Sequence, residues 1–258
     1  MILKPRPFRK PNPGHPLAKG LVGFWLMNEG GGNIVQDLSG NGNVGTISGA
    51  VWTPGKFGSC LDFDSAVADY ITLRASNKLN LLDKNMTLCF WVKINSLMPD
   101  TSYLSNHSDG VERADITFRF GKFRWDLDNG PTADYLYLDN RNWRDNLWHH
   151  FVVVHNETEA KAYGYIDGVI GDNSPQTITA TGSKDISGSR LIGYSSLSFY
   201  GVISYVMVYD RALTAPEIAQ LYREPFCMFE RDDFALWTGA MGGEMPSVYD
   251  SIFFGCNF

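Results

Sequence analysis

The sequence contains little of what several large classes of protein require. Only four of its 258 residues are cysteine and five are histidine, and no C-x-x-C pair or histidine cluster occurs, which argues against the common zinc motifs. No run approaches the roughly 18 apolar residues of a membrane-spanning helix. Lys and Arg form no block after the KPRPFRK start, and the net charge is −6, so a nucleic-acid groove is not expected. The expected partners are neutral molecules or other proteins.

The first residues and the cysteines indicate in which cellular compartment the chain is expected. The first residues, MILKPRPFRKPNPGHP, have prolines where a signal peptide has its apolar stretch, so no signal peptide is expected. Cys60, Cys89, Cys227 and Cys256 allow three disulfide connectivities, and without secretion reduced thiols are favoured. We therefore expect synthesis in a cytoplasm, where the chain stays until something else moves it.

A dinucleotide-binding loop is suggested by spacing and opposed by context. Gly40, Gly42 and Gly45 follow the G-x-G-x-x-G pattern. That loop requires a helix directly after it, whose N-terminal N–H groups hold the pyrophosphate. Here β-branched and aromatic residues follow, interrupted by Gly49, and both features oppose a helix. We interpret the glycines as turn residues that allow a positive φ between strands, with a nucleotide site as the minor alternative.

Three regions follow from composition. Residues 1–19 contain five prolines among basic residues and predict an extended arm. Residues 20–223 alternate in short strands separated by Gly, Asn and Asp, which predicts an all-β, antiparallel two-sheet sandwich. One helix is predicted at TAPEIAQLY, with Thr214 as N-cap and Glu217 in a capping box. Residues 224–258 form an aromatic, Gly-rich tail that must pack on the sandwich or on a neighbouring subunit.

The predicted strands are the segments that alternate most clearly. They are GLVGFWLM, CLDFDS, YITL, MTLCFWVKI, DITFRFG, KFRWDLD, DYLYLD, WHHFVVVH, KAYGYIDGV, SRLIGY and GVISYVMVYD. Trp25, Trp91 and Trp148 lie in strongly apolar strands, so we expect all three in the core.

The middle region resembles a known family. Its opening, GLVGFWLMNEGGGNIVQDLSGNGNVGTISGAVWTPGKFGSCLDFDSAVADYITL, is similar to the opening of the laminin-G-like branch of the concanavalin A-like lectin/glucanase superfamily, and MTLCFWVKI, WHHFVVVH, AYGYIDGV and VMVYDRALTAPEIAQLY follow in order. The resemblance covers residues 20–222 and implies a jelly-roll sandwich that binds carbohydrate or protein surfaces, often with calcium. The segment HPLAKGLVG at the start of this region and the segment LYREPF at its end resemble the corresponding segments of modules in bacteriophage virion proteins.

A calcium loop is the first candidate site. Asp37, Ser39 and Asn41 place oxygens at alternate positions before Gly42, as in the first half of such a loop. Ser48 stands where the loop would have its Glu, so further ligands would have to come from elsewhere in the chain. The candidate ligands are Asp37, Ser39, Asn41, Asp64 and Asp69. A bare structural turn is favoured over calcium.

A glycan-binding patch is the second candidate site. Such a site needs aromatic faces for the CH groups of a sugar and a few planar polar side chains. Alternation in KFRWDLD directs Phe123, Trp125 and Leu127 to the core, and alternation in DYLYLD does the same for Leu136 and Leu138. The opposite face then carries the predicted patch, Tyr135, Tyr137, Arg124 and Asp126, together with Trp143 from the next segment. An ordinary outer face or a subunit contact is the alternative.

Catalysis is not expected. The E-x-D-x-E pattern of the family's glucanases is absent, and its nearest substitute, Asp126 and Asp128, reads more simply as a solvated strand face. His149 and His150 are neighbours in a strand, so their rings point to opposite faces and cannot form a pair. No nucleophile elbow, oxyanion loop or P-loop is present.

Two functional hypotheses remain, with a glycoside hydrolase as a third and least favoured one. The first is a non-catalytic structural or interaction protein of the bacteriophage virion surface, a capsid decoration or a tail or fibre component. Its arm and tail would anchor it to neighbouring virion subunits, in a homo-oligomer or a larger assembly. The second is a carbohydrate-binding adhesin that recognises host-surface glycans. Neither requires a cofactor, and calcium is the one considered.

Overall fold

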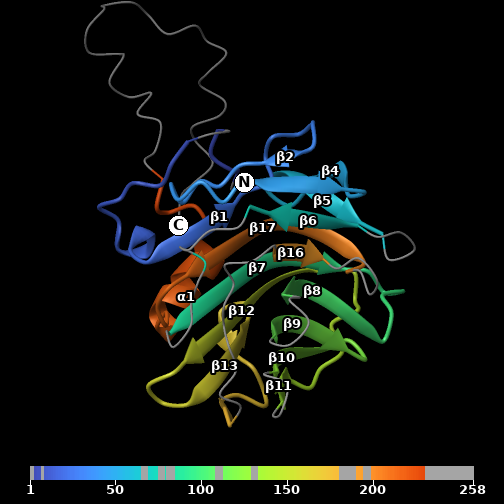
Figure 1. Cartoon of the computed structure of the whole chain (residues 1–258), viewed down its shortest axis with the longest axis vertical. Coiled ribbons are helices and arrows are strands. Elements are labelled where there is room, and N and C mark those ends of the chain that lie inside the picture. Colours follow the sequence, from blue (N-terminus) through green and yellow to red (C-terminus); the bar gives the residue numbers. More distant parts are fainter. Residues whose placement is uncertain are drawn as a thin grey trace, which may run out of the picture.

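The computed structural model describes residues 3–6, 9–64, 69–74, 79, 85–107, 113–128, 133–179, 190–193 and 199–229. These residues form two facing β-sheets, called here the back sheet and the front sheet (Figure 1). The back sheet consists of β1 (Leu21–Trp25), β4 (Val51–Gly55), β5 (Gly58–Phe63), β7 (Met86–Ile94), β12 (Trp148–Asn156), β13 (Lys161–Ile166), β14 (Val169–Ile170), β15 (Gln176–Thr177) and β17 (Gly201–Tyr209). The front sheet consists of β2 (Ile34–Val35), β3 (Gly45–Ser48), β6 (Tyr70–Leu73), β8 (Thr101–His107), β9 (Arg113–Arg119), β10 (Lys122–Asp128), β11 (Ala133–Asp139) and β16 (Arg190–Gly193).

The strand order brings distant segments together. The back sheet runs β14-β13-β12-β7-β17-β5-β4, with β1 paired to β17 and β15 paired to β13. The front sheet runs β11-β10-β9-β8-β16-β6-β3-β2. All pairings among the described strands are antiparallel, which confirms the predicted sandwich.

Each predicted strand segment overlaps an observed strand, and several observed strands were not predicted. The segment KAYGYIDGV divides into β13 and β14 at a turn in which Asp167 and Gly168 have positive φ. The sequence missed β8 because TSYLSNH is largely polar, and it missed β4 because Pro54 reads as a strand breaker. Proline is tolerated in β4 because this strand lies at the edge of the back sheet.

One hydrophobic core fills the space between the sheets. Trp25, Phe90 and Phe151 enter it from the back sheet, and Phe118 and Phe123 enter it from the front sheet. The Phe123 and Phe151 rings lie 4.9 Å apart between their centroids, and the Phe118 ring meets Phe151 edge-on at 5.1 Å. These contacts fix β9 and β10 against β12, so the opposite faces of β9 and β10 point away from the core.

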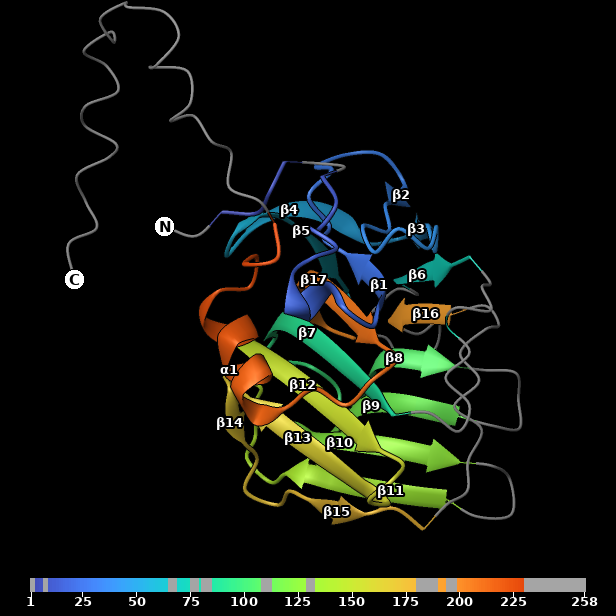
Figure 2. The same ribbon diagram turned by 90° about the vertical axis from the view of Figure 1, so that its left-hand side faces the viewer.

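A second core covers the outer face of the back sheet. In Figure 2, α1 (Ala215–Arg223) lies beside β7 and β12, on the side away from β8–β11. The cluster joins Trp91 and Tyr205 of the sheet to Ile218 of α1 and to Leu17 and Phe229 of the flanking segments. Because both faces of the back sheet are covered, β7 and β17 are buried along almost their whole length.

The α1 helix begins as predicted. Thr214 is its N-cap, Glu217 completes the capping box, and a proline occupies the first turn. Arg211 forms an ion pair with Glu217 at 2.8 Å, which holds the helix start against the end of β17. Ile218 and Leu221 are buried against the sheet.

The N-terminal arm packs on its own sandwich over the described residues. The Lys4 Nζ donates to the carbonyl oxygens of Met27 at 3.1 Å and Ser204 at 2.7 Å, and also to that of Ser59. Burial lowers the pKa of Lys4 to about 8. The Asn12 N–H donates to the Met228 carbonyl at 2.8 Å, so the arm lies beside the end of the described chain.

The arm also departs from a fully extended backbone. A short 3-10 turn, η1 (Pro16–Ala18), follows the cap residue His15, whose ring accepts from the Leu17 N–H. The turn places Leu17 in the second core, where its exposed fraction is 1%. The tail from residue 230 onward lies outside the described residues.

Three of the four cysteines are described, and Cys60, Cys89 and Cys227 are free thiols. Cys256 lies outside the described residues. Among the described residues, no helix is long and apolar enough to cross a membrane.

We expect Leu17→Ala to lower the free energy of unfolding by about 3 kcal/mol, because it leaves a cavity in the second core. Leu3→Ala is the matched control in the same arm, since Leu3 is 59% exposed, and it should change stability by less than about 0.5 kcal/mol. Urea unfolding monitored by tryptophan fluorescence measures both. Equal stability of the two variants would show that the arm does not contribute to the fold.

Candidate functional site

The outward side chains of β9, β10 and β11 form what we call the polar face. Strand pairing aligns them in rows across the three strands. Asp126 lies opposite Asp115 on one side and Tyr135 on the other. Arg124 lies opposite Thr117 and Tyr137, and Lys122 lies opposite Arg119. The polar face thus consists of Asp115, Thr117, Arg119, Lys122, Arg124, Asp126, Tyr135 and Tyr137.

A buried ion pair organises the centre of the polar face. Arg124 Nε lies 2.6 Å from Asp126 Oδ1, and Arg124 Nη2 donates to Asp126 Oδ2, also at 2.6 Å. Thr117 Oγ1 accepts from Arg124 Nε at 3.1 Å and donates to Asp126 Oδ2 at 3.1 Å. Arg124 and Asp126 retain only 9% and 3% exposure. Such a two-point pair holds the guanidinium in one plane.

The guanidinium contacts two tyrosine rings. Arg124 Cζ lies 5.0 Å from the centroid of the Tyr135 ring and 5.5 Å from that of Tyr137. Lys122 Nζ approaches the Tyr137 ring to 6.0 Å. Tyr135 is 50% exposed and Tyr137 is half-buried, while Leu136 and Leu138, which alternate with them, are buried. The rings therefore rest on a charged group held from below, with part of their surface open to solvent.

Four of the five residues predicted for the patch come together, and the fifth does not. Arg124 and Asp126 lie on the predicted face, but they are nearly buried, because they pair with each other beneath the tyrosines. The prediction that Trp143 looks outward is wrong. Its exposure is 7%, and its Nε1 donates to Asp139 Oδ1 at 3.1 Å while its ring meets Phe151 edge-on.

Trp143 is drawn inward by a buried carboxylate. Asp139 is fully buried and also accepts from Arg141 Nη2 at 2.9 Å, and the Arg141 guanidinium lies 4.3 Å from the Trp143 ring. Burial alone would raise the pKa of Asp139, but the bonds from Arg141 outweigh it and lower that pKa.

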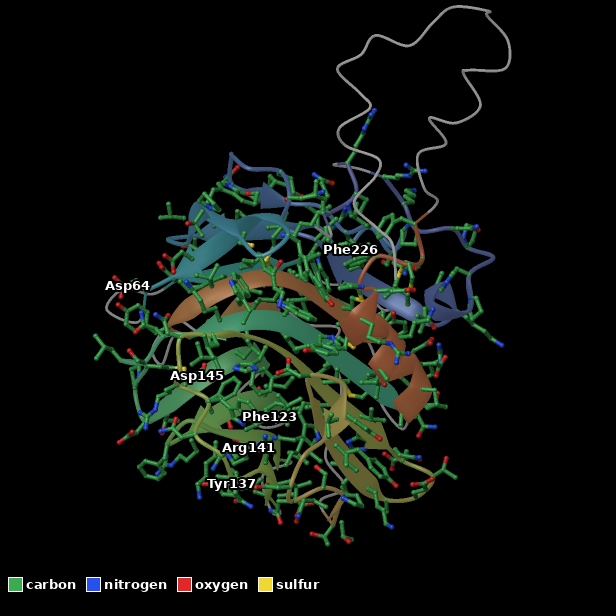
Figure 3. The ribbon with its side chains drawn as sticks, turned by 180° about the vertical axis from the view of Figure 1, so that it is seen from behind. Asp64, Phe123, Tyr137, Arg141, Asp145 and Phe226 are labelled. Carbon is green, nitrogen blue, oxygen red and sulfur yellow. The ribbon has the colours of Figure 1, made fainter. Side chains whose placement is uncertain are left out.

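Figure 3 labels Arg141 and Tyr137, which mark this end of the front sheet, and Phe226, which lies toward the arm.

Sequence reasoning missed the residues that β9 contributes to the face. Asp115, Thr117 and Arg119 alternate in DITFRFG in the same phase as the outward residues of β10. The tight turn at Phe120 and Gly121, both with positive φ, fixes that register. Treating the two segments as one hairpin would have placed Thr117 beside Arg124.

The D-x-S-G-N-G-N loop is a turn built on β1. Asp37 Oδ1 accepts from the backbone N–H groups of Phe24 and Ser39, and Oδ2 accepts from that of Asn43. Ser39 Oγ and Asn41 Nδ2 donate to the Val22 carbonyl. The Gly40 and Gly42 residues of this loop have φ of 91° and 75°, and β3 begins at Gly45, which confirms a turn between strands with no helix after it.

The same contacts engage several polar atoms of the residues predicted to bind calcium. Asp37, Ser39 and Asn41 each bond to backbone groups. Asp69, just before β6, accepts through Oδ2 from the Asp64 N–H, just after β5. Because Gly45 pairs with Leu73 and Ser48 pairs with Tyr70, Asp69 lies at the opposite end of β3 from the loop. Within the described part of the chain, no group of three or more His, Cys, Asp or Glu side chains could hold a metal ion. The calcium site stays a prediction.

The two adjacent histidines of β12 lie on opposite faces, as predicted, in contrasting environments. His149 has Asp167 Oδ2 at 2.7 Å from Nδ1 and Asp145 Oδ2 at 3.0 Å from Nε2. Burial alone would lower the pKa of His149, but these two carboxylates outweigh it and raise that pKa. His150 is fully buried against Trp91 under α1, and burial lowers its pKa to about 3.

Residues 64–219 match a family model described as the concanavalin A-like lectin/glucanases superfamily. No curated protein matches the sequence. Among solved structures, the binding domain of Paraclostridial Mosquitocidal Protein 1 superposes with a TM-score of 0.69 at 18% identity, over 82% of this chain and 53% of that one. The binding domain of botulinum neurotoxin serotype D gives 0.66 at 14% identity, over 81% and 51%. Trypanosoma rangeli sialidase in complex with sialic acid gives 0.61 at 20% identity, over 82% and 34%.

At these identities the likeness to solved structures shows the fold alone. The chain spans about half the length of the two binding domains and a third of the sialidase chain. The family match begins at residue 64, after the loop of Asp37, and includes all of β9, β10 and β11.

The histidines predict the response of stability to pH. The folded pKa of His150, about 3, lies below its unfolded value near 6.5, so the unfolded state binds more protons between these values. Stability should therefore fall as the pH falls below about 6.5, by at most about 1.4 kcal/mol per pH unit, and His150→Phe should remove that slope. Urea unfolding between about pH 6.5 and about pH 5 measures it, above the range in which ordinary carboxyls titrate.

His149 should act in the opposite sense. Its raised folded pKa gives a contribution that is complete below about pH 6.5 and is lost as the pH rises through the folded value. His149→Gln should flatten the alkaline side of the profile and leave the acid side unchanged. A profile that neither substitution alters would contradict both assignments.

Proposed function

Because the chain belongs to the concanavalin A-like lectin/glucanases superfamily, we propose that it is a non-catalytic binding module that recognises glycans through the polar face. The observation that carries this proposal is the pair Tyr135 and Tyr137, which rest on the Arg124 guanidinium at 5.0 and 5.5 Å. Exposed aromatic surface fixed on a rigid sheet is the kind of platform on which the CH faces of sugar rings pack.

The contacts beneath the tyrosines reduce the conformational entropy that is lost when a ligand binds. Arg124 is held by Asp126 and Thr117, and the strands below are fixed by Phe118 and Phe123 in the core. Side chains that are already ordered lose less conformational freedom when a ligand arrives. The tyrosine hydroxyls and Lys122 then offer polar groups at the rim of the aromatic surface.

The solved structures with this fold support binding as its use. Two of them are named as binding domains, and the third is a sialidase in complex with sialic acid. Catalysis has less support in the polar face. Both oxygens of Asp126 face Arg124, and Oδ2 also accepts from Thr117, so this carboxylate is committed to the protein.

Binding should fail when the aromatic surface is removed. We expect Tyr135→Ala combined with Tyr137→Ala to reduce glycan binding at least about tenfold, because each ring contributes about 1 kcal/mol or more. Tyr163→Ala, on β13 of the back sheet, is the matched control and should bind as the parent does. A glycan array measures all three proteins, and an array without signal for the parent would remove the proposal.

We propose assembly on the bacteriophage virion surface as a second function, and exposed apolar side chains at one end of the sandwich favour it. We call Leu97, Phe120 and Leu147 the end patch, with exposures of 77%, 50% and 60%. Their loops are joined by backbone bonds, Phe120 N–H to Asp100 and Asn146 N–H to Ile94. Exposed large apolar side chains on adjoining loops favour a contact with another protein.

The virion role has a direct test. We expect Leu97→Ser combined with Leu147→Ser to reduce incorporation into particles while the unfolding curve stays unchanged, because both side chains are exposed. Val51→Ser is the matched control, since Val51 is 65% exposed on the edge strand β4, three strands across the back sheet from β7. Particles counted by cryo-microscopy with unchanged occupancy of the double variant would contradict the contact.

A further inference from the structure

Two cations of the polar face lie directly opposite each other. Arg119 on β9 and Lys122 on β10 are cross-strand neighbours. Like charges in this position destabilise a sheet, so the arrangement has a cost for the fold. Within the described residues neither has a carboxylate partner, whereas the nearby Arg124, Arg141 and Arg144 are paired with Asp126, Asp139 and Asp100, respectively.

Both cations are positioned by neutral contacts. Arg119 Nη1 donates to Thr101 Oγ1 at 2.7 Å, and its Cζ lies 5.0 Å from the Phe120 ring centroid. Lys122 Nζ lies over the Tyr137 ring at 6.0 Å. Both side chains are half-buried, so they are partly desolvated and partly open. An anion that bridges them would remove the repulsion and gain two charge-assisted hydrogen bonds.

Arg119 and Lys122, which we call the cationic row, adjoin the rows that contain Tyr137 and Tyr135. Arg119 and Lys122 lie two residues along their strands from Thr117 and Arg124, respectively, which is about 6.8 Å. A single ligand can therefore reach both. At the other end of the face, Tyr135 lies beside Asp126, whose charge is paired with Arg124, so the positive charge of Arg119 and Lys122 is confined to one end and the face has a direction.

We propose that the ligand of the polar face is an acidic glycan, which binds with a carboxylate or sulfate group between Arg119 and Lys122. Its neutral sugar rings then extend over Tyr137 and Tyr135, away from the anionic group. This inference rests on the proposed function and adds the chemical class of the ligand and its orientation. Carboxylated and sulfated glycans share the required chemistry, and the experiment separates them.

The test uses the full chain on a glycan array with matched sets of carboxylated, sulfated and neutral glycans of the same backbone. The parent should bind one or both acidic sets in preference to the neutral set. Lys122→Gln and Arg119→Gln should each weaken that binding about tenfold, because each removes a charge-assisted hydrogen bond. Lys161→Gln, on β13 of the back sheet, is the matched control and should bind as the parent does.

Folding is monitored separately. Removing one of two opposed cations should leave the unfolding midpoint unchanged or raise it, so a loss of binding by the Gln variants is not a loss of fold. The relative response of the carboxylated and sulfated sets to the same variants identifies which anion the pair recognises.

The outcomes separate the inference from the function on which it rests. Equal binding of neutral and acidic glycans, lost in the double tyrosine variant but retained in Lys122→Gln and Arg119→Gln, would overturn the acidic ligand and leave glycan binding in place. A parent that binds no glycan would overturn both. Acidic preference that Lys161→Gln weakens as much as Lys122→Gln would also overturn the inference, because binding would then follow overall charge.

Discussion

The two-sided burial of the back sheet is the constraint on which the rest of the structure depends. Its outer face is covered by α1, by Leu17 of the arm and by the segment that ends at Phe229. Strands buried on both faces must be apolar at almost every position, and this is why β7 and β17 carry few polar side chains. A polar outer face is therefore left to the front sheet.

The polar face of the front sheet has a buried ion pair at its centre, Arg124 with Asp126. Removing Arg124 and Asp126 from water costs free energy, and their attraction offsets this cost only with good geometry and further hydrogen bonds. Thr117 supplies such bonds, and the two tyrosine rings cover the pair. A buried ion pair of this kind adds little to the free energy of unfolding. It fixes orientation instead, since a guanidinium held in one plane also holds the rings above it.

The sequence predicts those features that depend on neighbours in the chain. Alternation in KFRWDLD placed Phe123 inward and Arg124 outward, and the capping residues located the start of α1 at Thr214. These are local rules, with side chains alternating along a strand and a side chain closing the first turn of a helix. They were enough for the fold and for the side of the sheet on which the tyrosines lie.

What the sequence could not predict depends on partners far along the chain. Lys4 is held by the carbonyl of Ser204, which is 200 positions away, so an arm that reads as free packs on its own sandwich. The burial of Trp143 depends on Asp139 being fully buried, and no rule of alternation decides that. The polar contribution of β9 required the register of a hairpin across Phe120 and Gly121.

The distribution of charge makes the polar face distinct within an acidic protein. With a net charge of −6, the chain as a whole repels anions, and at physiological ionic strength that repulsion is screened beyond about 8 Å. Contacts closer than this are decided by local charges. Arg119 and Lys122 are such charges, since the carboxylates Asp115 and Asp126 lie four strand residues further along the same face. A protein acidic overall can thus present a short cationic row beside an aromatic surface, and the two together are the basis for the ligand class and direction that we propose.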